Sequence, residues 1–576
     1  MTSPKIAARA LLATALLAAL ALPASAHAET EVVRASRVAL SPPLRSLPPL
    51  TIAAPMPEGA VREKRAPGAI ARDVAWDSPF TYGFDEALQD SFGPEAVEAL
   101  PAPIRTFEGI NRLWPWLPPD TTGDVGPAHY VQAVNSGVRV WMKDGTPATG
   151  VINLDAIWDA LGAGSVCSTA DDGDPIVLYD RMADRWLISQ FAGTSTTNNF
   201  HQCIALSQNG DAAGAYWLYD FLWSTTKLND YPHFGVWPDG YYMTVNQFNG
   251  STSAWAGGAV GVFERSQMLN GGVARLLKVD LFTSSFPNNY GGQLPATWDG
   301  GASIPADTPG IVVQWDDSTW IGDPADTLRI WRVDVDWSVP SIVMGINGAA
   351  IDPNHKVSTA DATPNGCTSR SCVPQSGTAV GLDAIGDGRL MFRMPLRNFG
   401  THDVLMINNT VGVGTGALQA APRWYELRGL LAGAPVIHQQ GTYAPDATHR
   451  WMASTAMDKG GNILIGYSRS SSSMFPSIAY AGRLAGDPLN TLALGEATMT
   501  AGGGSQTSTS NRWGDYSTLS LDPTDDCTFW YTNEYYSATS SASWQTRIGA
   551  IRLLECGLFT DGVEIGSTNM WSAKTP

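Results

Sequence analysis

The chain has 576 residues, enough for two to four domains of ordinary size or for one large all-β domain. Glycine and proline are abundant, at 58 and 38 residues, while charged residues make up only 16%, which argues against a coiled coil or long charged helices. The net charge of −18 would repel a phosphate backbone or an anionic membrane surface, so we expect no nucleic acid partner.

The first 28 residues have the three-part layout of a secretory signal peptide. Lys5 and Arg9 precede an apolar run over 11–22, and small residues follow up to Ala28. This run is shorter than the roughly 20 residues that a helix needs to span a bilayer. We predict cleavage after Ala28 and a monomeric secreted or periplasmic protein without a membrane span.

Residues 29–105 are predicted to form an irregular, proline-rich arm or a propeptide. Proline pairs at 42–43 and 48–49 interrupt any periodic pattern in this stretch. From Thr106 onward the chain changes to short alternating strands separated by turn signals. We therefore assign 106–556 to one β-propeller and 557–576 to a C-terminal tail.

A degenerate repeat is the basis for the propeller prediction. Each unit opens with an aspartate, continues into an apolar strand and a polar turn, and ends in a second strand rich in aromatic residues. The first two spacings, 50 and 56 residues, leave room for the four short strands of a propeller blade. The clear openings are Asp124, Asp174, Asp230 and Asp515.

Three weaker units between the third and the last opening bring the total to seven. The predicted fold is therefore an all-β, seven-bladed β-propeller, whose last blade is closed by the strand near Phe107 pairing with the C-terminal strands. A pair of β-sandwiches is the alternative, and it explains the alternation but not the recurring aspartate.

The six cysteines are typical of an oxidising compartment, where an even number favours disulfides. A zinc site is the less favoured alternative because no paired CxxC motif is present. Neighbours along the chain are expected to pair, as Cys167–Cys203, Cys367–Cys372 and Cys527–Cys556.

The aspartates that open the repeats have two interpretations. They could form a carboxylate ring around the central channel, and cleavage of a glycosidic bond needs two carboxyl groups close together. The structural interpretation, favoured because the residue recurs from blade to blade, is that each aspartate accepts backbone N–H groups in the turn before the innermost strand. The candidate catalytic residues are Asp124, Asp174, Asp230, Asp515 and Glu534.

The segment from Arg512 to Tyr536 contains the densest group of polar and aromatic residues. Aromatic faces can stack on a sugar ring and an arginine can bind an anionic group. The alternative is a blade core that buries Trp513 and Trp530, with Arg512 paired to Asp515. The candidate ligand-binding residues are Arg512, Trp513, Tyr535 and Tyr536.

A calcium ion is the one cofactor that the sequence raises. Oxygen ligands at Asp171, Asp172 and Asp174 suit calcium, but the twelve-residue loop with its closing glutamate is missing, so a solvated turn is the alternative. No Gly-x-Ser-x-Gly elbow and no HExxH motif is present, which argues against a serine hydrolase or a zinc enzyme.

Three motifs resemble a group of exported bacterial propeller-type proteins whose members mostly have no assigned activity. They are PPDTTGDVGP at 118–127, Asp174-Pro175 leading to Tyr179-Asp180-Arg181, and RWGDY at 512–516. The resemblance extends from Thr106 to about Cys556. It implies the fold and export, and it transfers no catalytic residue.

Two classes of function remain. The first is a site at the channel mouth that binds a polysaccharide or cell-surface glycan or cleaves it, as a glycoside hydrolase or lyase. The second is a non-catalytic propeller that binds a protein or a cell-surface partner. A sialidase is disfavoured because its three arginines and its Ser-x-Asp-x-Gly-x-x-Trp boxes are not visible in the sequence.

Overall fold

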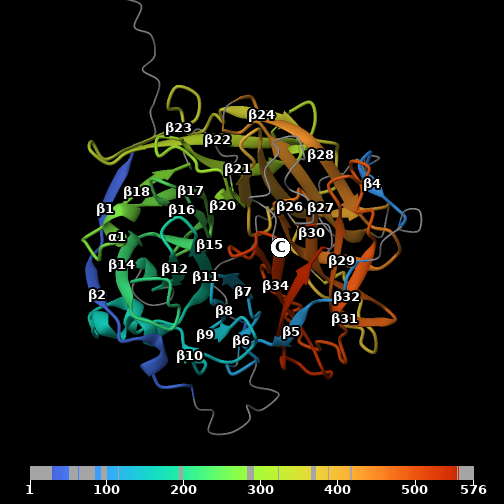
Figure 1. The fold of residues 1–576 in the computed structure, drawn as a ribbon, viewed down its shortest axis with the longest axis horizontal. Coiled ribbons are helices and arrows are strands. Elements are labelled where there is room, and N and C mark those ends of the chain that lie inside the picture. The colour runs from blue at the N-terminus through green and yellow to red at the C-terminus, as the bar shows by residue number, and fades with distance from the viewer. Residues whose placement is uncertain are drawn as a thin grey trace, which may run out of the picture.

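The computed structural model describes residues 29–50, 62–63, 85–92, 100–553 and 556, except for short stretches at 115, 194–198, 282–290, 322, 365–370, 387, 416–417 and 432. These residues form seven sheets of four to six strands and one two-stranded ribbon. Figure 1 shows the sheets arranged around a common axis. None of the helices in the described residues is long and apolar enough to cross a membrane.

The first three sheets follow one another along the chain. Sheet 1 contains β7 (Thr122–Val125), β8 (His129–Val134), β9 (Gly137–Met142) and β10 (Ile152–Asn153). Sheet 2 contains β11 (Gly173–Asp180), β12 (Arg185–Ala192), β13 (Phe200–Ser207), β14 (Tyr216–Ser224) and β2 (Arg37–Leu40). Sheet 3 contains β15 (Lys227–Val236), β16 (Tyr241–Asn249), β17 (Trp255–Phe263), β18 (Arg275–Asp280) and β1 (Glu31–Arg34).

The next two sheets share one stretch of chain at the axis. Sheet 4 contains β19 (Leu294–Pro295), β21 (Gly310–Asp316), β22 (Thr327–Asp336), β23 (Ser341–Met344) and β24 (His355–Ser358). Sheet 5 contains β20 (Thr297–Gly301), β25 (Pro395–Asn398), β26 (Asp403–Val413), β27 (Gln419–Arg428), β28 (Val436–Tyr443) and β4 (Leu88–Gln89).

The last two sheets complete the circle. Sheet 6 contains β29 (His449–Met457), β30 (Ile463–Ser471), β31 (Met474–Arg483) and β32 (Glu496–Thr500). Sheet 7 contains β33 (Thr518–Leu521), β34 (Thr528–Tyr535), β35 (Gln545–Arg552) and β5 (Arg105–Glu108). The ribbon pairs β3 (Arg62–Glu63) with β6 (Trp116–Leu117), and the short helices are η1 (Leu44–Ser46), η2 (Asp155–Leu161), η3 (Val166–Ser168), α1 (Arg265–Met268) and α2 (Ser318–Ile321).

The innermost strands form a closed ring. β7 contacts β11, β11 contacts β15, β15 contacts β19 and β20, β25 contacts β29, and β33 contacts both β29 and β7. The predicted all-β propeller class is confirmed. The number of blades stays a prediction, because β19 and β20 are separated by Ala296 alone and yet belong to two different sheets.

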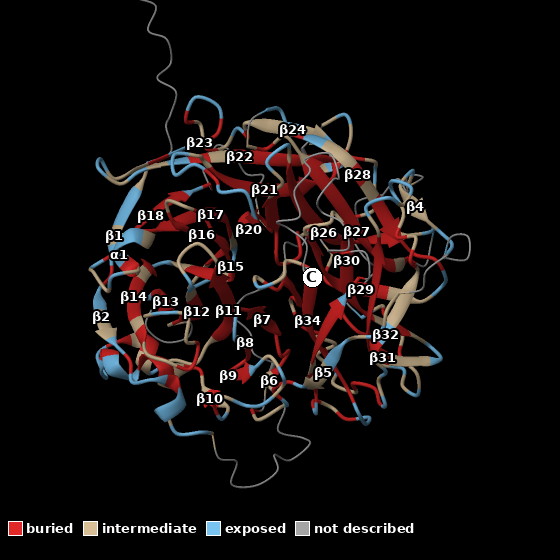
Figure 2. Cartoon of the chain, in the orientation of Figure 1, coloured by how far each residue is buried: buried red, intermediate tan, exposed pale blue. Residues whose placement is uncertain are grey.

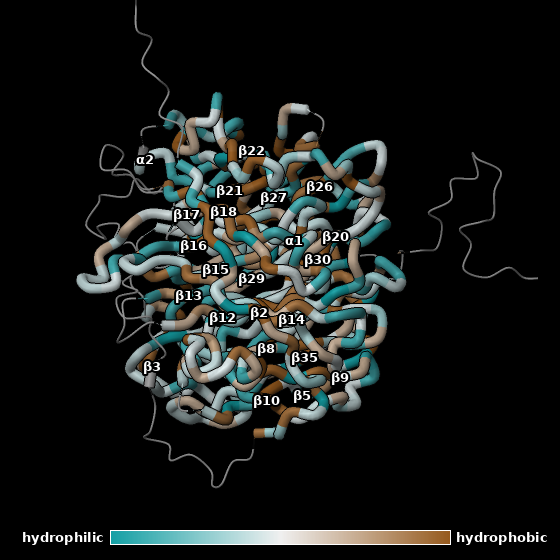
Figure 3. The backbone as a smooth tube through the Cα atoms, turned by 90° about the vertical axis from the view of Figure 1, so that its left-hand side faces the viewer, coloured by the Kyte–Doolittle hydropathy of each residue, from teal (hydrophilic) through white to brown (hydrophobic). Residues whose placement is uncertain are grey.

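The core is divided into clusters that lie between neighbouring sheets. Val131 of sheet 1 and Val177 of sheet 2 belong to one cluster, and Leu178 of sheet 2 and Phe234 of sheet 3 belong to the next. Figure 2 shows buried residues throughout the interior, and Figure 3 shows hydrophobic stretches recurring over the height of the molecule. Each sheet therefore buries both of its faces against its neighbours, which one sheet alone cannot do.

The predicted closure of the ring is confirmed. β5 pairs antiparallel with β35, with Phe107 opposite Ile548. The Phe107 ring also lies 6.0 Å from the ring of Trp141 in sheet 1. One segment therefore completes sheet 7 and connects it to sheet 1.

The described part of the segment 29–105 includes strands that add to the propeller sheets, whereas residues 51–61, 64–84 and 93–99 of the predicted arm lie outside the described residues. β1 adds to β18 and β2 adds to β14, each as an outermost strand, and β4 adds to β28. In Figure 1 the blue strands β1 and β2 lie along the outer edge. Val33 and Val38 pack against the core cluster between sheets 2 and 3, so apolar residues that the proline signals obscured hold the arm in place.

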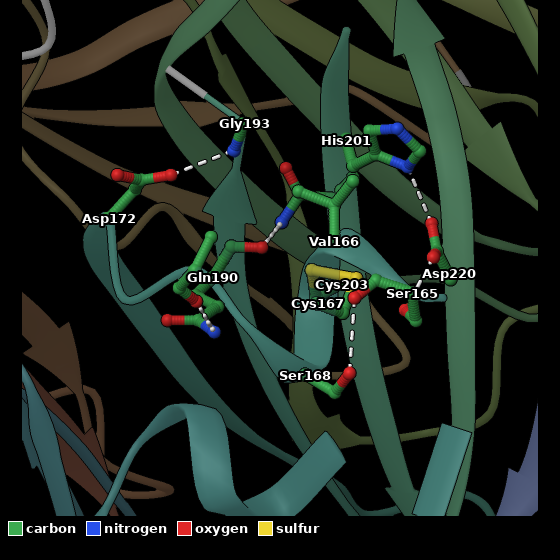
Figure 4. The surroundings of a disulfide bond; sticks show 12 residues. Ser165, Val166, Cys167, Ser168, Asp172, Gln190, Gly193, His201, Cys203 and Asp220 are labelled. Atoms are coloured by element: carbon green, nitrogen blue, oxygen red, sulfur yellow. Dashed lines mark hydrogen bonds and ion pairs between the residues drawn. A yellow bond between two sulfur atoms is a disulfide. The ribbon is translucent and has the colours of Figure 1, made fainter. Parts of the chain in front are cut away.

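Two of the three predicted disulfides are confirmed. Cys167 bonds Cys203 and Cys527 bonds Cys556. Figure 4 shows the first bond linking η3 to β13. The predicted partner of Cys372, Cys367, lies outside the described residues.

Replacing Cys527 and Cys556 together by serine should lower the free energy of unfolding by about 3–4 kcal/mol. The bond closes a loop with a sequence separation of 29, and removing it frees the unfolded chain. Denaturation in urea measures the loss, with reduction of the wild-type protein as the comparison. An unchanged midpoint would show that this bond does not stabilise the fold.

Candidate functional site

Three of the four aspartates that open the repeats lie at or near the beginning of the innermost strands. Asp174 follows the first residue of β11, Asp515 precedes β33, and Asp230 lies in β15 at a break in its pairing with β16. The backbone has positive φ at Asp174, 45°, and at Tyr231, 53°. Positive φ in residues other than glycine is energetically costly and is found often at functional sites. The beginnings of these strands are therefore a candidate functional site.

Five carboxyl groups gather at this end of the channel: Asp120, Asp174, Asp230, Asp515 and Glu534, here called the acidic cluster. Their charges act on one another, since Asp120, Asp230 and Asp515 all influence the Asp174 carboxyl. The Asp515 N–H donates to Asp120 Oδ1 at 2.7 Å. Residues from sheets 2, 3 and 7, and from the segment before sheet 1, thereby meet at one place.

Asn135 connects two members of the acidic cluster. Its Nδ2 donates to the Asp120 carboxyl, and its Oδ1 accepts the Asp174 N–H at 3.0 Å. Asn135 is fully buried. The relative positions of Asp120 and Asp174 are thus fixed by a side chain from the end of β8.

Burial and mutual repulsion give the carboxyl groups of the acidic cluster different pKa values. Burial, followed by the Asp515 charge, raises the pKa of Asp120 to about 8 and that of Asp230 to about 6. Burial also raises the pKa of Asp174 and of Glu534 well above their usual values. At neutral pH the acidic cluster therefore contains protonated and ionised carboxyl groups side by side, the combination that acid–base catalysis uses.

Two arginines balance part of this negative charge. Arg512 forms an ion pair with Asp515, as the structural interpretation of the sequence expected. The Arg389 guanidinium lies 5.0 Å from the centre of the Tyr231 ring, and its charge lowers the pKa of the Asp230 carboxyl. Sequence reasoning missed Arg389, which no motif surrounds, and Asp120, which lies inside the quoted PPDTTGDVGP segment.

Aromatic rings pack together beside the acidic cluster. The His233 ring stacks on Phe392 at 5.1 Å and meets Tyr231 edge-on at 4.1 Å and Tyr516 at 5.3 Å. All four are buried, and burial lowers the pKa of His233 to about 3, so it carries no charge at neutral pH. These four rings therefore form an uncharged, buried group beside the acidic cluster.

The candidate Asp124 lies elsewhere and has a structural role. Its Oδ1 accepts the Val125 N–H at 2.8 Å and its Oδ2 accepts the Tyr179 N–H at 2.9 Å. Its charged neighbours are Arg393 and Asp299. They belong to a second network, at the other ends of the innermost strands, in which Arg181 and Arg397 bind Asp526 and Arg393 binds Asp299.

The predicted aromatic platform for a sugar needs correction. Trp513 and Tyr536 are fully buried and stack on each other at 5.6 Å. Tyr535 points its hydroxyl at Glu108 of β5, 3.0 Å away. Alternation at the end of β34 and packing on β5 explain why Tyr535 and Tyr536 point in different directions. Of the predicted ligand-binding residues, only Arg512 therefore lies at the acidic cluster.

The predicted calcium ligands are not brought together. Asp172 Oδ2 accepts the Gly193 N–H at 2.7 Å, whereas Asp174 belongs to the acidic cluster. In the described ranges, no three histidine, cysteine, aspartate or glutamate side chains are grouped as a metal site.

Comparisons with known proteins give only distant likenesses. No protein-family model and no curated protein matches the chain. The phage phi92 endosialidase is 9% identical over 68% of either chain, with a TM-score of 0.35. A Trypanosoma rangeli sialidase is 11% identical over 66% of this chain, which spans 54% of the sialidase, with a TM-score of 0.29.

The similarity to a polysaccharide lyase, an ulvan lyase, covers a larger share of both chains than the two similarities above. This lyase is 9% identical over 80% of this chain and 95% of its own, with a TM-score of 0.35. At such identities and scores these likenesses carry no argument about function.

Proposed function

We propose that the acidic cluster is a glycan site whose chemistry is acid–base cleavage of a glycosidic bond. The observation that carries this proposal is the meeting of Asp174, whose pKa is raised well above its usual value by burial, with Asp230, whose pKa is about 6. Glycosidic cleavage uses one carboxyl group as proton donor and a second, ionised one as base or nucleophile.

The roles follow from exposure and charge. Asp230 and Asp515 are half-buried, so they can meet both substrate and water. Asp174, beside them, is the proton donor, and Arg512 and Arg389 limit the repulsion between the carboxylates. Glu534 is buried beside Arg512 and Asp515, whose charges act on its carboxyl group.

Asp174→Asn should abolish cleavage of a polysaccharide substrate by the secreted protein, with a loss of at least about 100-fold in rate. Asparagine keeps the size of the side chain but cannot donate the acidic proton. Assays on a panel of neutral and acidic polysaccharides, with product detection by reducing ends, measure the effect, and Asp515→Asn tests a second carboxyl group of the acidic cluster.

The control is Asp124→Asn, which alters an equally buried aspartate outside the acidic cluster. It should lower the melting temperature and leave the activity of the folded fraction intact. Folded Asp174→Asn and Asp515→Asn variants that keep full activity or binding would refute the site. Binding of a protein partner that neither variant affects would favour the non-catalytic alternative.

A further inference from the structure

A cavity outside the acidic cluster lies between sheets 5 and 6. It has a volume of about 260 Å³ and is lined by the residues here called the cationic pocket: His402, Arg428, His438, Lys459 and Arg483. Arg428 ends β27, Arg483 ends β31, and Lys459 lies in the turn between β29 and β30. The volume is close to the lower end for small-molecule sites, about 300 Å³.

The cationic pocket is remote from the acidic cluster. The Lys459 N–H donates to the backbone oxygen of Asp526, which belongs to the arginine network where the innermost strands end. The acidic cluster lies where those strands begin. The two sites therefore occupy opposite faces of the propeller.

Glu426 is the one carboxylate that lines this cavity within the described residues, and its oxygens are already in use. One accepts Arg428 Nε at 2.7 Å and the other accepts Gln439 Nε2. The ion pair of Glu426 is with Arg428, and Lys459 and Arg483 add two further positive charges, of which that of Arg483 is partly balanced by Asp487 and Glu426. In a chain with a net charge of −18, such a cavity is an unusual local excess of positive charge.

Arg483 provides a second, independent indication. It is 2% exposed, and its Nη2 donates to the backbone oxygens of Asp487 and Pro488. Its Nε is buried without a hydrogen-bond partner in the described part of the chain. A buried guanidinium N–H without a partner is costly, and an anion in the cavity would accept it.

The two histidines add donors without adding charge at neutral pH. Burial, together with the Arg428 charge, lowers the pKa of both His402 and His438, while the Glu426 charge opposes this. Asp403 also faces His402, and Arg483 faces His438. A neutral imidazole still has one N–H to donate to an oxygen.

We propose that the cationic pocket binds the carboxylate or sulfate group of a small anion. The guanidinium of Arg483 and the ammonium of Lys459 donate to its oxygens, as arginine and lysine do to carboxylates and sulfates. Two sources share this chemistry, an acidic sugar unit within a polysaccharide and a free small acid.

Calorimetric titration of the full-length protein at low salt tests the proposal, with sodium sulfate, glucuronic acid and neutral glucose as probes. Sulfate and glucuronate should bind and glucose should not. Lys459→Gln, at a half-buried turn position, should weaken anion binding about tenfold or more. Arg483→Lys, which keeps the charge but loses Nε, should weaken it likewise.

The matched control is Lys356→Gln, which removes an exposed lysine on β24 away from the cavity. It should bind as the wild type does. Tighter binding of a glucuronate oligosaccharide than of the monosaccharide would assign the source to a polysaccharide, and equal binding to a free acid. Absence of anion binding by the wild type, or equal binding by a folded Lys459→Gln variant, would overturn the proposal.

Discussion

Replacing Glu534 by glutamine should raise the free energy of unfolding at pH 8, because a buried polar group without a hydrogen-bond partner costs about 1–3 kcal/mol. Burial, with Asp120 and Asp515 nearby, raises the pKa of this carboxyl well above its usual 4.5. Its Oε2 is buried without a hydrogen-bond partner among the described residues, so little is lost when the charge goes.

The sign follows from proton linkage. A carboxyl group whose pKa is raised in the folded state contributes its full stability below its ordinary pKa, and this stability is lost as the pH rises through the folded-state pKa. Glutamine has no proton to lose, so the variant keeps that stability at pH 8. At pH 4, where the wild-type carboxyl is already protonated, the two proteins should unfold alike.

Urea denaturation at pH 4, 6 and 8 measures this difference, and Asp124→Asn is the opposite control. Asp124 accepts two backbone N–H groups on its two oxygens, and asparagine can accept only one of them. We expect that variant to lose about 1–3 kcal/mol at pH 8. A Glu534→Gln variant that is less stable than wild type at pH 8 would place Glu534 with the structural carboxyls.

A chain that begins at Gly109 should be recovered mostly as aggregate, whereas a chain that begins at Leu100 should remain soluble and folded. The first lacks β5, so the edge of β35 is left unpaired and the contact of Phe107 with Trp141 is lost. An unpaired strand edge is a template for pairing with other chains.

The second chain loses β1, β2, β3 and β4 but keeps the strand that closes the ring. It should show a lower melting temperature than the protein that begins at Glu29, because the outer edges of β14 and β18 are uncovered. Size-exclusion chromatography and thermal denaturation measure both results. A soluble, cooperatively unfolding chain from Gly109 would show that β5 is dispensable.

Local patterns in the sequence predicted the regular part of the fold. The run from Asp174 to Ser189 contains two apolar stretches separated by a polar turn, as a hairpin requires, and β11 and β12 pair there. The arm strands β1 and β2 escaped prediction because each spans only four residues, too few to show a period. Their position depends on Trp217 and Lys278, which are far away in the sequence.

The site was predictable only in part, for a physical reason. Asp174, Asp230 and Asp515 stand in recurring positions and meet, whereas Asp124, which the same repeat singled out, does not, and Asp120 takes part instead. The sequence alone did not show whether Trp513 is buried or exposed. Its burial depends on residues from other segments that pack over it in the folded protein. Arg389 reaches the acidic cluster from a segment without any repeat signal.

The pairing of β5 with β35 also sets an order of events during synthesis. A growing chain emerges from its N-terminus, and domains form as their parts become available. Phe107 emerges early, yet its partner Ile548 is made only near the end, so the first segment of the ring must wait while six sheets form. Closure between such distant segments is entropically slow, which makes the last sheet the step most exposed to interruption.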